Sequence, residues 1–177
     1  KAVWDPDIRQ YEIRIWGDDY LVAPDHCRIT PKTAGGSSHQ DFLYLVIIYY
    51  LINGQDIPPS GTWVSEKDIK GGEGFFRGPH LIPVQSIADA VNNDLSLFKQ
   101  VCATLQGTPL DFADAAFCFE ITPTVPVALL FWEGDEDFPC EVKMLFDKTI
   151  DRHLALDIIF ALAVEVCAAV THAVKKK

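Results

Sequence analysis

The chain has 177 residues and a formal net charge of −10, from 25 acidic and 15 basic residues. This length fits one domain, and we expect residues 1–177 to form a single folded unit. The negative charge argues against nucleic acid or an anionic membrane surface as a partner, because both carry phosphate groups. Hydrophobic residues make up 49% of the chain and charged residues 23%, a balance that excludes a wholly disordered protein.

The cysteines argue against a metal cluster. Their number, five, is odd, and no C-x-x-C pair occurs, so a zinc ribbon or a cysteine-ligated iron–sulfur cluster has no support. Cys102 and Cys167 lie in apolar stretches and are predicted to be buried free thiols of a reducing compartment. Residues 1–5 show no apolar segment typical of a signal peptide. We therefore expect a cytoplasmic protein.

The first third of the chain predicts a hairpin and a buried helix. Apolar residues alternate with polar ones over 11–15, a turn follows at 17–19, and a second strand returns over 20–22. The apolar run 42–51 exceeds the usual strand length, so we predict a helix, capped by Ser37 or Ser38. A strand is the alternative interpretation of this run, because it is rich in β-branched and aromatic residues.

The second half predicts helices on either side of another hairpin. Apolar spacing predicts a helix over 87–106 that begins at Ser86 and breaks near 92–94. Strands are predicted over 117–132 and 141–146, joined by the acidic turn 133–137. Together these elements predict an α+β domain in which a small antiparallel sheet, formed by the two hairpins, packs on helices.

The apolar stretch 150–174 is predicted to be a core helix. Asp157 and Glu165 interrupt it, and two carboxylates within hydrocarbon would be costly, so no membrane span is expected. Thr149 or Asp151 is predicted to cap the helix. Its apolar residues cover more than one stripe, so we expect the helix either to be central in the fold or to form a homodimer interface.

The segment 54–83 is the least ordinary part of the sequence. It contains six glycines and four prolines and shows no regular period. A loop of this length in a compact domain is usually functional or disordered, and its large aromatic residues argue against disorder. The alternative interpretation is a packed structural loop whose aromatic residues form a small core of their own.

Within this segment, residues 61–80 carry the side chains of a site for a flat, partly anionic cofactor. Glycine amides can cradle anions, cationic side chains add charge-assisted donors, and aromatic rings can stack on a planar ligand. His80 could also be a metal ligand or an acid–base group. The predicted cofactor-binding residues are Trp63, Lys67, Gly71, Gly72, Phe75, Phe76, Arg77 and His80, with His80 as the metal ligand.

Two further patterns favour ordinary structural roles. The acidic turn 133–137 lacks the spacing of a calcium-binding loop, and a solvated hairpin tip is the preferred interpretation. His153 and Asp157 lie one helical turn apart, which favours an ion pair near a helix start.

Two long motifs resemble a known family. They are Gly61–Asp68 continuing to Phe75–His80, and Val127–Pro139 together with Leu145–Asp147. On these motifs most of the chain is similar to the family called domain of unknown function 3786. The resemblance implies a setting in anaerobic bacteria and archaea, where some relatives carry an added iron–sulfur domain similar to that of the corrinoid iron–sulfur protein. This chain lacks those cysteines, and the resemblance supplies no catalytic residues.

Three functions follow as hypotheses. The first is a cytoplasmic cofactor-binding module for a tetrapyrrole-like ligand, corrinoid or haem, in anaerobic metabolism; the corrinoid emphasis comes from the resemblance, and the flat-ligand argument from the residues. The second is a protein-interaction or scaffold domain that uses residues 61–80 and the C-terminal helix. The third, an enzyme with His80 or Glu66 as acid–base, ranks below both because no second catalytic group is placed.

Overall fold

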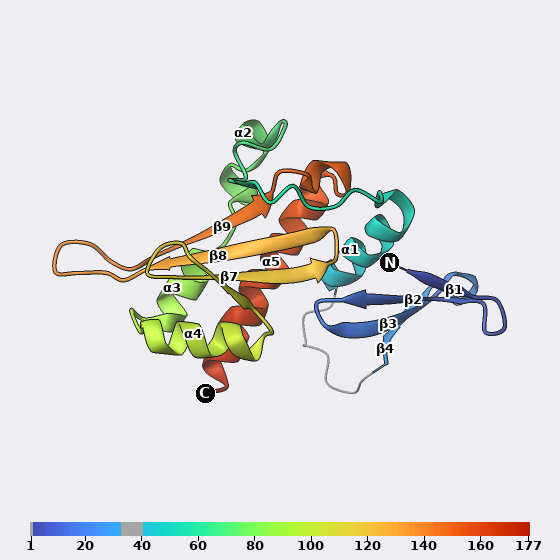
Figure 1. The fold of residues 1–177 in the computed structure, drawn as a ribbon, viewed down its shortest axis with the longest axis horizontal. Coiled ribbons are helices and arrows are strands. Elements are labelled where there is room, and N and C mark those ends of the chain that lie inside the picture. Colours follow the sequence, from blue (N-terminus) through green and yellow to red (C-terminus); the bar gives the residue numbers. More distant parts are fainter. Residues whose placement is uncertain (1, 33–40) are drawn as a thin grey trace.

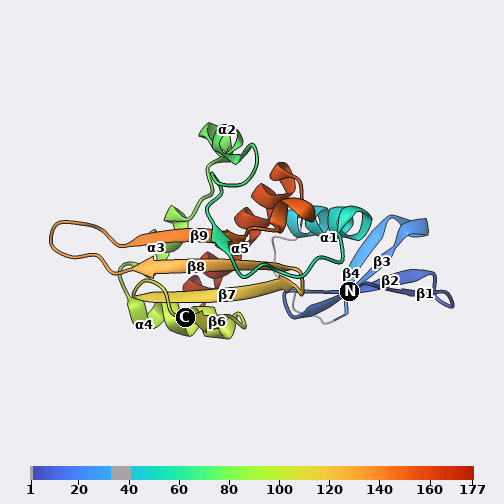
Figure 2. The same ribbon diagram turned by 45° about the horizontal axis from the view of Figure 1, so that its top comes forward.

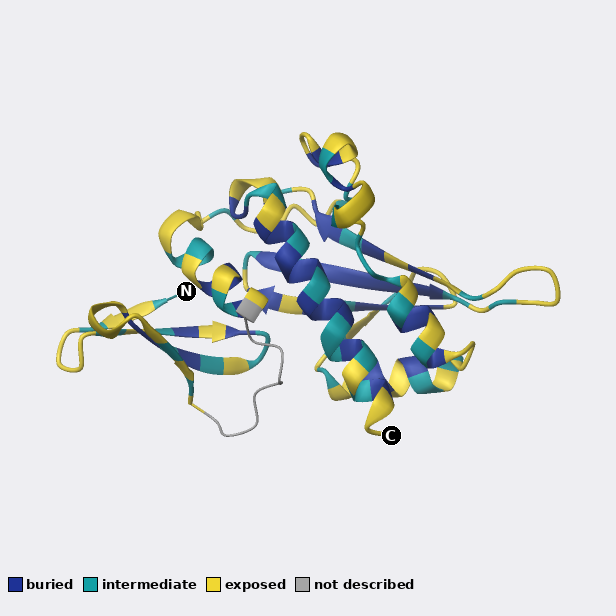
Figure 3. Cartoon of the chain, turned by 180° about the vertical axis from the view of Figure 1, so that it is seen from behind, coloured by how far each residue is buried: buried dark blue, intermediate teal, exposed yellow. Residues whose placement is uncertain are grey.

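The computed structural model describes residues 2–32 and 41–177, which form an α+β domain with two antiparallel sheets. The larger sheet has five strands in the order β5-β9-β8-β7-β6, and helices lie on one side of it only (Figure 1). The view from behind shows these helices in front of the sheet (Figure 3). The strands of this sheet are β5 (Trp63–Val64), β6 (Thr108–Leu110), β7 (Ala115–Thr122), β8 (Val125–Trp132) and β9 (Glu141–Asp147).

The smaller sheet is a four-stranded meander at the N-terminal end of the chain. It lies beyond one end of the larger sheet, next to α1 (Asp41–Asn53) (Figure 2). Its strands are β1 (Val3–Asp5), β2 (Gln10–Ile15), β3 (Asp18–Ala23) and β4 (Arg28–Pro31). The α+β class is therefore confirmed, but the two predicted hairpins, β2–β3 and β8–β9, do not share a sheet. Each hairpin pairs with further strands, β1 and β4 in the smaller sheet and β5, β7 and β6 in the larger one, to form a sheet of its own.

The turn between β2 and β3 fastens the meander to the rest of the domain. Trp16 and Gly17 both have positive φ, 49° and 81°, as a two-residue hairpin turn requires, so the turn lies one residue earlier than predicted. The Trp16 amide donates to the Ile121 carbonyl at 2.8 Å, and its indole Nε1 donates to the Leu105 carbonyl at 3.1 Å. A bulky residue in this conformation is unusual, and these two bonds hold it there.

The described residues form five α-helices, of which α5 crosses one side of the larger sheet and α2 stands away from it (Figure 1). Three short 3₁₀ turns, at Pro24–His26, Gly78–His80 and Ile150–Arg152, accompany them. The predicted helix over 42–51 is confirmed, but its proposed caps, Ser37 and Ser38, lie outside the described residues. The helices are α1 (Asp41–Asn53), α2 (Gly72–Phe75), α3 (Gln85–Val91), α4 (Leu95–Thr104) and α5 (Leu156–Lys175).

Two predicted helix starts are wrong. Ser86 lies inside α3, where its hydroxyl donates to the Pro83 carbonyl at 2.7 Å; the true cap in this region is Asp94, which accepts from the Leu97 amide at 2.8 Å. The predicted break at 92–94 is confirmed and separates α3 from α4. Neither Thr149 nor Asp151 caps α5, because the chain makes a 3₁₀ turn there and extends at Ala155 before the helix begins.

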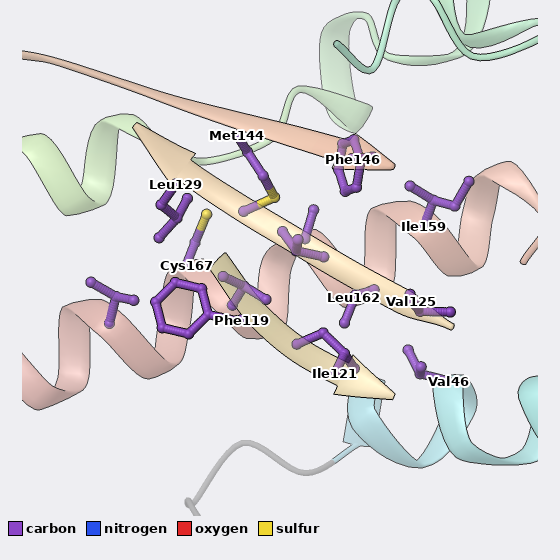
Figure 4. Close-up of a cluster of buried hydrophobic side chains, with 14 of the residues drawn as sticks. Val46, Phe119, Ile121, Val125, Leu129, Met144, Phe146, Ile159, Leu162 and Cys167 are labelled. Carbon is purple, nitrogen blue, oxygen red and sulfur yellow. The ribbon is translucent and has the colours of Figure 1, made fainter. Parts of the chain in front are cut away.

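Helix α5 is central, which is one of the two placements that the sequence predicts. From Ile158 to Val174 its only exposed residue is His172. Its side chains meet those of the sheet and of α1 in the core (Figure 4), where the labelled residues are Val46, Phe119, Ile121, Val125, Leu129, Met144, Phe146, Ile159, Leu162 and Cys167. By length and composition α5 is the one described helix that could cross a membrane, and in this fold it serves as the core helix.

The five cysteines are free. Cys102 and Cys167 are buried, as predicted, and burial raises the pKa of each thiol to about 12. Both therefore act as small apolar core residues. Cys27 is exposed at the left-handed end of the 3₁₀ turn Pro24–His26.

Candidate functional site

The segment 61–80 begins at a buried carboxylate that holds it to the sheet. Asp147, at the end of β9, is 1% exposed and accepts hydrogen bonds from the amides of Ser60 (3.0 Å), Gly61 (2.8 Å) and Thr149 (2.9 Å). The Ser60 and Thr149 hydroxyls also donate to it, at 3.1 and 2.7 Å. Burial raises the pKa of Asp147, but these hydrogen bonds outweigh burial and hold the pKa below its ordinary value.

The structure separates Trp63 from most of the other predicted site residues. Trp63 lies in β5 and packs on the helix-free side of the larger sheet, with Leu130 and Leu145. Phe76 is buried in the main core instead. The chain between them forms a projection that carries α2 (Figure 1). The eight predicted residues therefore do not form one continuous wall.

Gly71 and Gly72 have steric roles in this projection. Gly71 has a φ of +80°, a conformation that disfavours any residue with a side chain. A Cβ on Gly72 would lie 1.9 Å from the Glu66 carbonyl oxygen, so only glycine fits there. The Gly72 amide donates to the Ile69 carbonyl at 2.7 Å. These contacts explain both glycines without a ligand.

The aromatic residues of the projection pack on one another. The His80 ring stacks on Phe75 at 4.4 Å between centroids and meets the edge of Phe160 at 5.4 Å. Phe75 meets Phe76 edge to face at 5.1 Å, and Phe76 is 2% exposed. Much of the ring surface that would stack on a planar cofactor is already in use.

The charged residues of the projection face solvent. Arg77 pairs with Glu73 one helical turn earlier, at 3.1 Å, and both side chains are exposed. Lys67 is exposed as well. Glu66 is half-buried, and no hydrogen bond or ion pair joins it to His80. Arg77 thus has the carboxylate partner expected of a packed loop.

No group of three or more His, Cys, Asp or Glu side chains among the described residues could hold a metal ion. His80, the predicted metal ligand, has aromatic rings as its closest recorded neighbours. The acidic turn 133–137 is an exposed hairpin tip, as predicted, with Gly134 its one half-buried residue. Asp135 accepts from the Asp137 and Phe138 amides, both at 2.9 Å, which lowers its pKa.

The predicted pairing of His153 with Asp157 is wrong. His153 precedes α5, is 1% exposed, and accepts from the Gln55 amide through Nδ1 at 3.4 Å, while its buried Nε2 makes no well-formed hydrogen bond to the residues that the structure describes. Asp157 instead accepts from the Ile158 amide. Burial lowers the pKa of His153, and the Asp147 carboxylate opposes that shift without cancelling it.

The helix-free side of the larger sheet forms an apolar surface that sequence reasoning missed. Cross-strand pairs of β7, β8 and β9 place small and large apolar residues on this side, and Figure 1 shows no helix in front of them. We call this surface the open face; its outer layer is the half-buried residues Trp63, Leu110, Trp132 and Leu145, which pack over the buried residues Ala116, Ala128 and Leu130. The Lys143 ammonium lies over the Trp132 ring, 5.2 Å from the ring centre.

One end of the open face is strongly acidic. The segments 89–94, 111–114 and 133–141 contain nine carboxylates, and the residues around them, 85–115 and 133–143, contain only two lysines, Lys99 and Lys143. Contacts bring these segments together: the Gly134 amide donates to Asn93 at 2.6 Å, and the Glu133 amide donates to Asp114 at 2.9 Å. We call this region the acidic pole. Phe138, 71% exposed, projects from it.

Comparison with known proteins gives a family without an assigned activity. The model of the family described as Domain of unknown function (DUF3786) matches residues 1–169. No curated protein and no solved structure matches the chain. Because the match covers nearly the whole chain, the resemblance drawn from the two sequence motifs is confirmed, and the chain belongs to the DUF3786 family.

Proposed function

We propose that this chain is a protein-interaction domain that binds a basic partner across the open face and the acidic pole. The observation that carries the proposal is the open face itself, a sheet surface with two half-buried tryptophans and no covering helix. Tryptophan is enriched among the residues that dominate binding at protein interfaces. The proposal keeps the interaction hypothesis but moves the surface, because α5 is buried and most of the segment 61–80 packs on itself.

The charge distribution supports a basic partner. Trp132 ends β8 and Glu133 follows it, so the apolar surface continues directly into the acidic pole. Phe138 supplies an exposed apolar side chain among carboxylates. A partner that fits both regions presents lysine or arginine around an apolar patch. Attraction between such surfaces speeds association and weakens with salt.

A photo-crosslinking experiment tests this proposal. A photoreactive phenylalanine analogue at position 138 should crosslink, in extracts of the native host, to a protein with a basic surface. The same analogue at Leu81, which is 63% exposed and lies outside the acidic pole, before α3, serves as the matched control. The crosslink at 138 should disappear at about 0.5 M salt, where the screening length is only a few ångströms. It should also weaken in Trp132→Ala.

Three results would refute the interaction proposal. They are identical products from positions 138 and 81, a product at 138 that neither salt nor Trp132→Ala affects, and the absence of any product. An acidic partner would also contradict it, since the acidic pole would repel such a protein.

The tetrapyrrole hypothesis for residues 61–80 stays a prediction and is the second candidate. What favours it is the half-buried His80 ring at the surface of an aromatic cluster. The visible spectrum of protein purified without oxygen tests it: a Soret or corrinoid band supports cofactor binding, and a colourless protein that haem and cobalamin do not stabilise contradicts it. The anaerobic setting and the cytoplasmic location likewise stay predictions.

A further inference from the structure

A cavity of about 360 Å³ lies between the first hairpin and the C-terminal half of α5. Trp16 and Tyr20 of the hairpin line it, with Leu43 of α1 and Leu105, which follows α4, beside them. On the opposite side α5 contributes Glu165 and Ala173, among others, and Lys176 directly after the helix also lines the cavity. The volume is in the range of small-molecule sites, which are mostly apolar with a few placed polar groups.

A buried carboxylate lines this cavity. Glu165 is 5% exposed, although it lies in the middle of an apolar core helix. It shares one stripe of α5 with His172 and Lys176, and a helix rises 1.5 Å per residue, so Lys176 lies about 16 Å further along the axis. The exposed residues His172 and Lys176 therefore place the basic groups of this stripe near the C-terminal end of α5. The buried part of the stripe carries the Glu165 carboxylate.

The aromatic walls are fixed in place. Trp16 is held by its indole bond to Leu105 and by edge contact with Phe119, with 5.4 Å between ring centroids. Tyr20 is 3% exposed. Burial, and then the nearby Asp18, Tyr44 and Glu165, raise the pKa of the Tyr20 hydroxyl to about 12, so it stays a neutral hydrogen-bonding group. A buried carboxylate beside electron-rich rings is an environment that attracts a cation.

We propose that this cavity binds a small organic cation, an ammonium group on an aromatic or aliphatic body, with the ammonium toward Glu165 and the body between Trp16 and Tyr20. Asp18, which is exposed and also lines the cavity, adds negative charge on the hairpin side. This site is separate from the open face and does not depend on the interaction proposal.

Calorimetric titration of the purified chain with three probes of one shape tests the proposal. They are 2-phenylethylamine, 2-phenylethanol and phenylacetate, which are cationic, neutral and anionic at neutral pH. The amine should bind saturably, and the alcohol and the acid should bind about tenfold more weakly or not at all, because a charge-assisted contact accounts for at least that factor.

Three variants and a control test whether the amine binds in this cavity. Glu165→Gln should weaken amine binding about tenfold and make amine and alcohol nearly equal. Ala173→Leu should block the cavity, and Asp18→Asn should weaken binding several-fold. The control Glu136→Gln removes an exposed charge from the acidic pole and should change nothing.

If Glu165→Gln does not fold, the other two variants decide. Equal affinity for all three probes, no saturable amine binding up to about 10 mM, or amine binding that survives Ala173→Leu would each overturn the proposal.

Discussion

Replacing Asp147 by alanine should destabilise the domain strongly, although the residue lies at the end of a strand. The carboxylate accepts hydrogen bonds from three backbone amides and two hydroxyls and is 1% exposed. The hydroxyls can rotate toward other partners, but the amides of Ser60, Gly61 and Thr149 cannot. A buried donor left without its charged acceptor costs about 1–3 kcal/mol, so we expect a total loss of about 3–5 kcal/mol.

Urea unfolding followed by tryptophan fluorescence measures this loss as a lower midpoint with an unchanged slope. Glu136→Ala, an exposed carboxylate at the hairpin tip, is the control and should change stability by less than about 0.5 kcal/mol. The pH dependence gives an independent check. Because the folded-state pKa of Asp147 is below its ordinary value of 3.8, its contribution is present above that value and is lost as the pH falls through the folded-state pKa.

The difference between wild type and Asp147→Ala should therefore be largest near neutral pH and shrink in acid. A loss of less than about 1 kcal/mol would show that water satisfies these amides, and the reasoning from burial would fail.

Further predictions concern the core, the buried histidine and the exposed loop. Leu162→Asp places a charge in the centre of the fold, where the side chain is 0% exposed, and should cost more than about 4 kcal/mol in urea unfolding or prevent folding; a stable, folded variant would contradict the central position of α5. Since the pKa of His153 is below its ordinary value of 6.5, wild type should lose stability as the pH falls from 6.5 toward that lower value, and His153→Phe should lose less over this range in thermal unfolding. Arg77→Ala breaks an exposed pair and should cost only about 0.3–0.5 kcal/mol, whereas a large loss would show that the pair holds the projection together. Gly17→Ala strains a turn with a φ of +81° and should cost about 1–2 kcal/mol, a value that equilibrium unfolding resolves.

Hydrophobic periodicity predicted the helices and strands of this fold better than it predicted how they pair and pack. The helix over 42–51, the break at 92–94 and the buried C-terminal helix follow from local patterns, because burial selects apolar residues at helical spacing. The division of the strands into two sheets does not follow from them, since strand pairing depends on contacts between distant segments. Helix starts were missed where a serine donates to a carbonyl, as Ser86 does, instead of accepting from an amide.

In the candidate site, too, the sequence did not reveal which residues contact one another. Composition correctly marked 61–80 as unusual, but it could not show that Gly72 is required by the Glu66 carbonyl or that Arg77 has Glu73 as its partner. β8 reads as apolar on both sides, which is typical of a strand covered on both faces, and residues 127–131 are indeed all buried. The sequence did not show that Trp63, Trp132 and Leu145, rather than a helix, cover the second side. One signal was present in the sequence: Glu165 stands in an apolar helix, and such a residue needs an environment that accounts for its charge.

The central position of α5 has a consequence for how the domain forms during synthesis. Every strand of the larger sheet precedes α5 in the chain, yet the helix-side residues of those strands pack on it. A nascent chain that has left the ribosome only as far as β9 would expose Phe119, Leu129 and Phe146 to water. We therefore expect folding to wait until α5 has emerged, and a ribosome-bound intermediate that ends before it to need a chaperone that binds apolar strands.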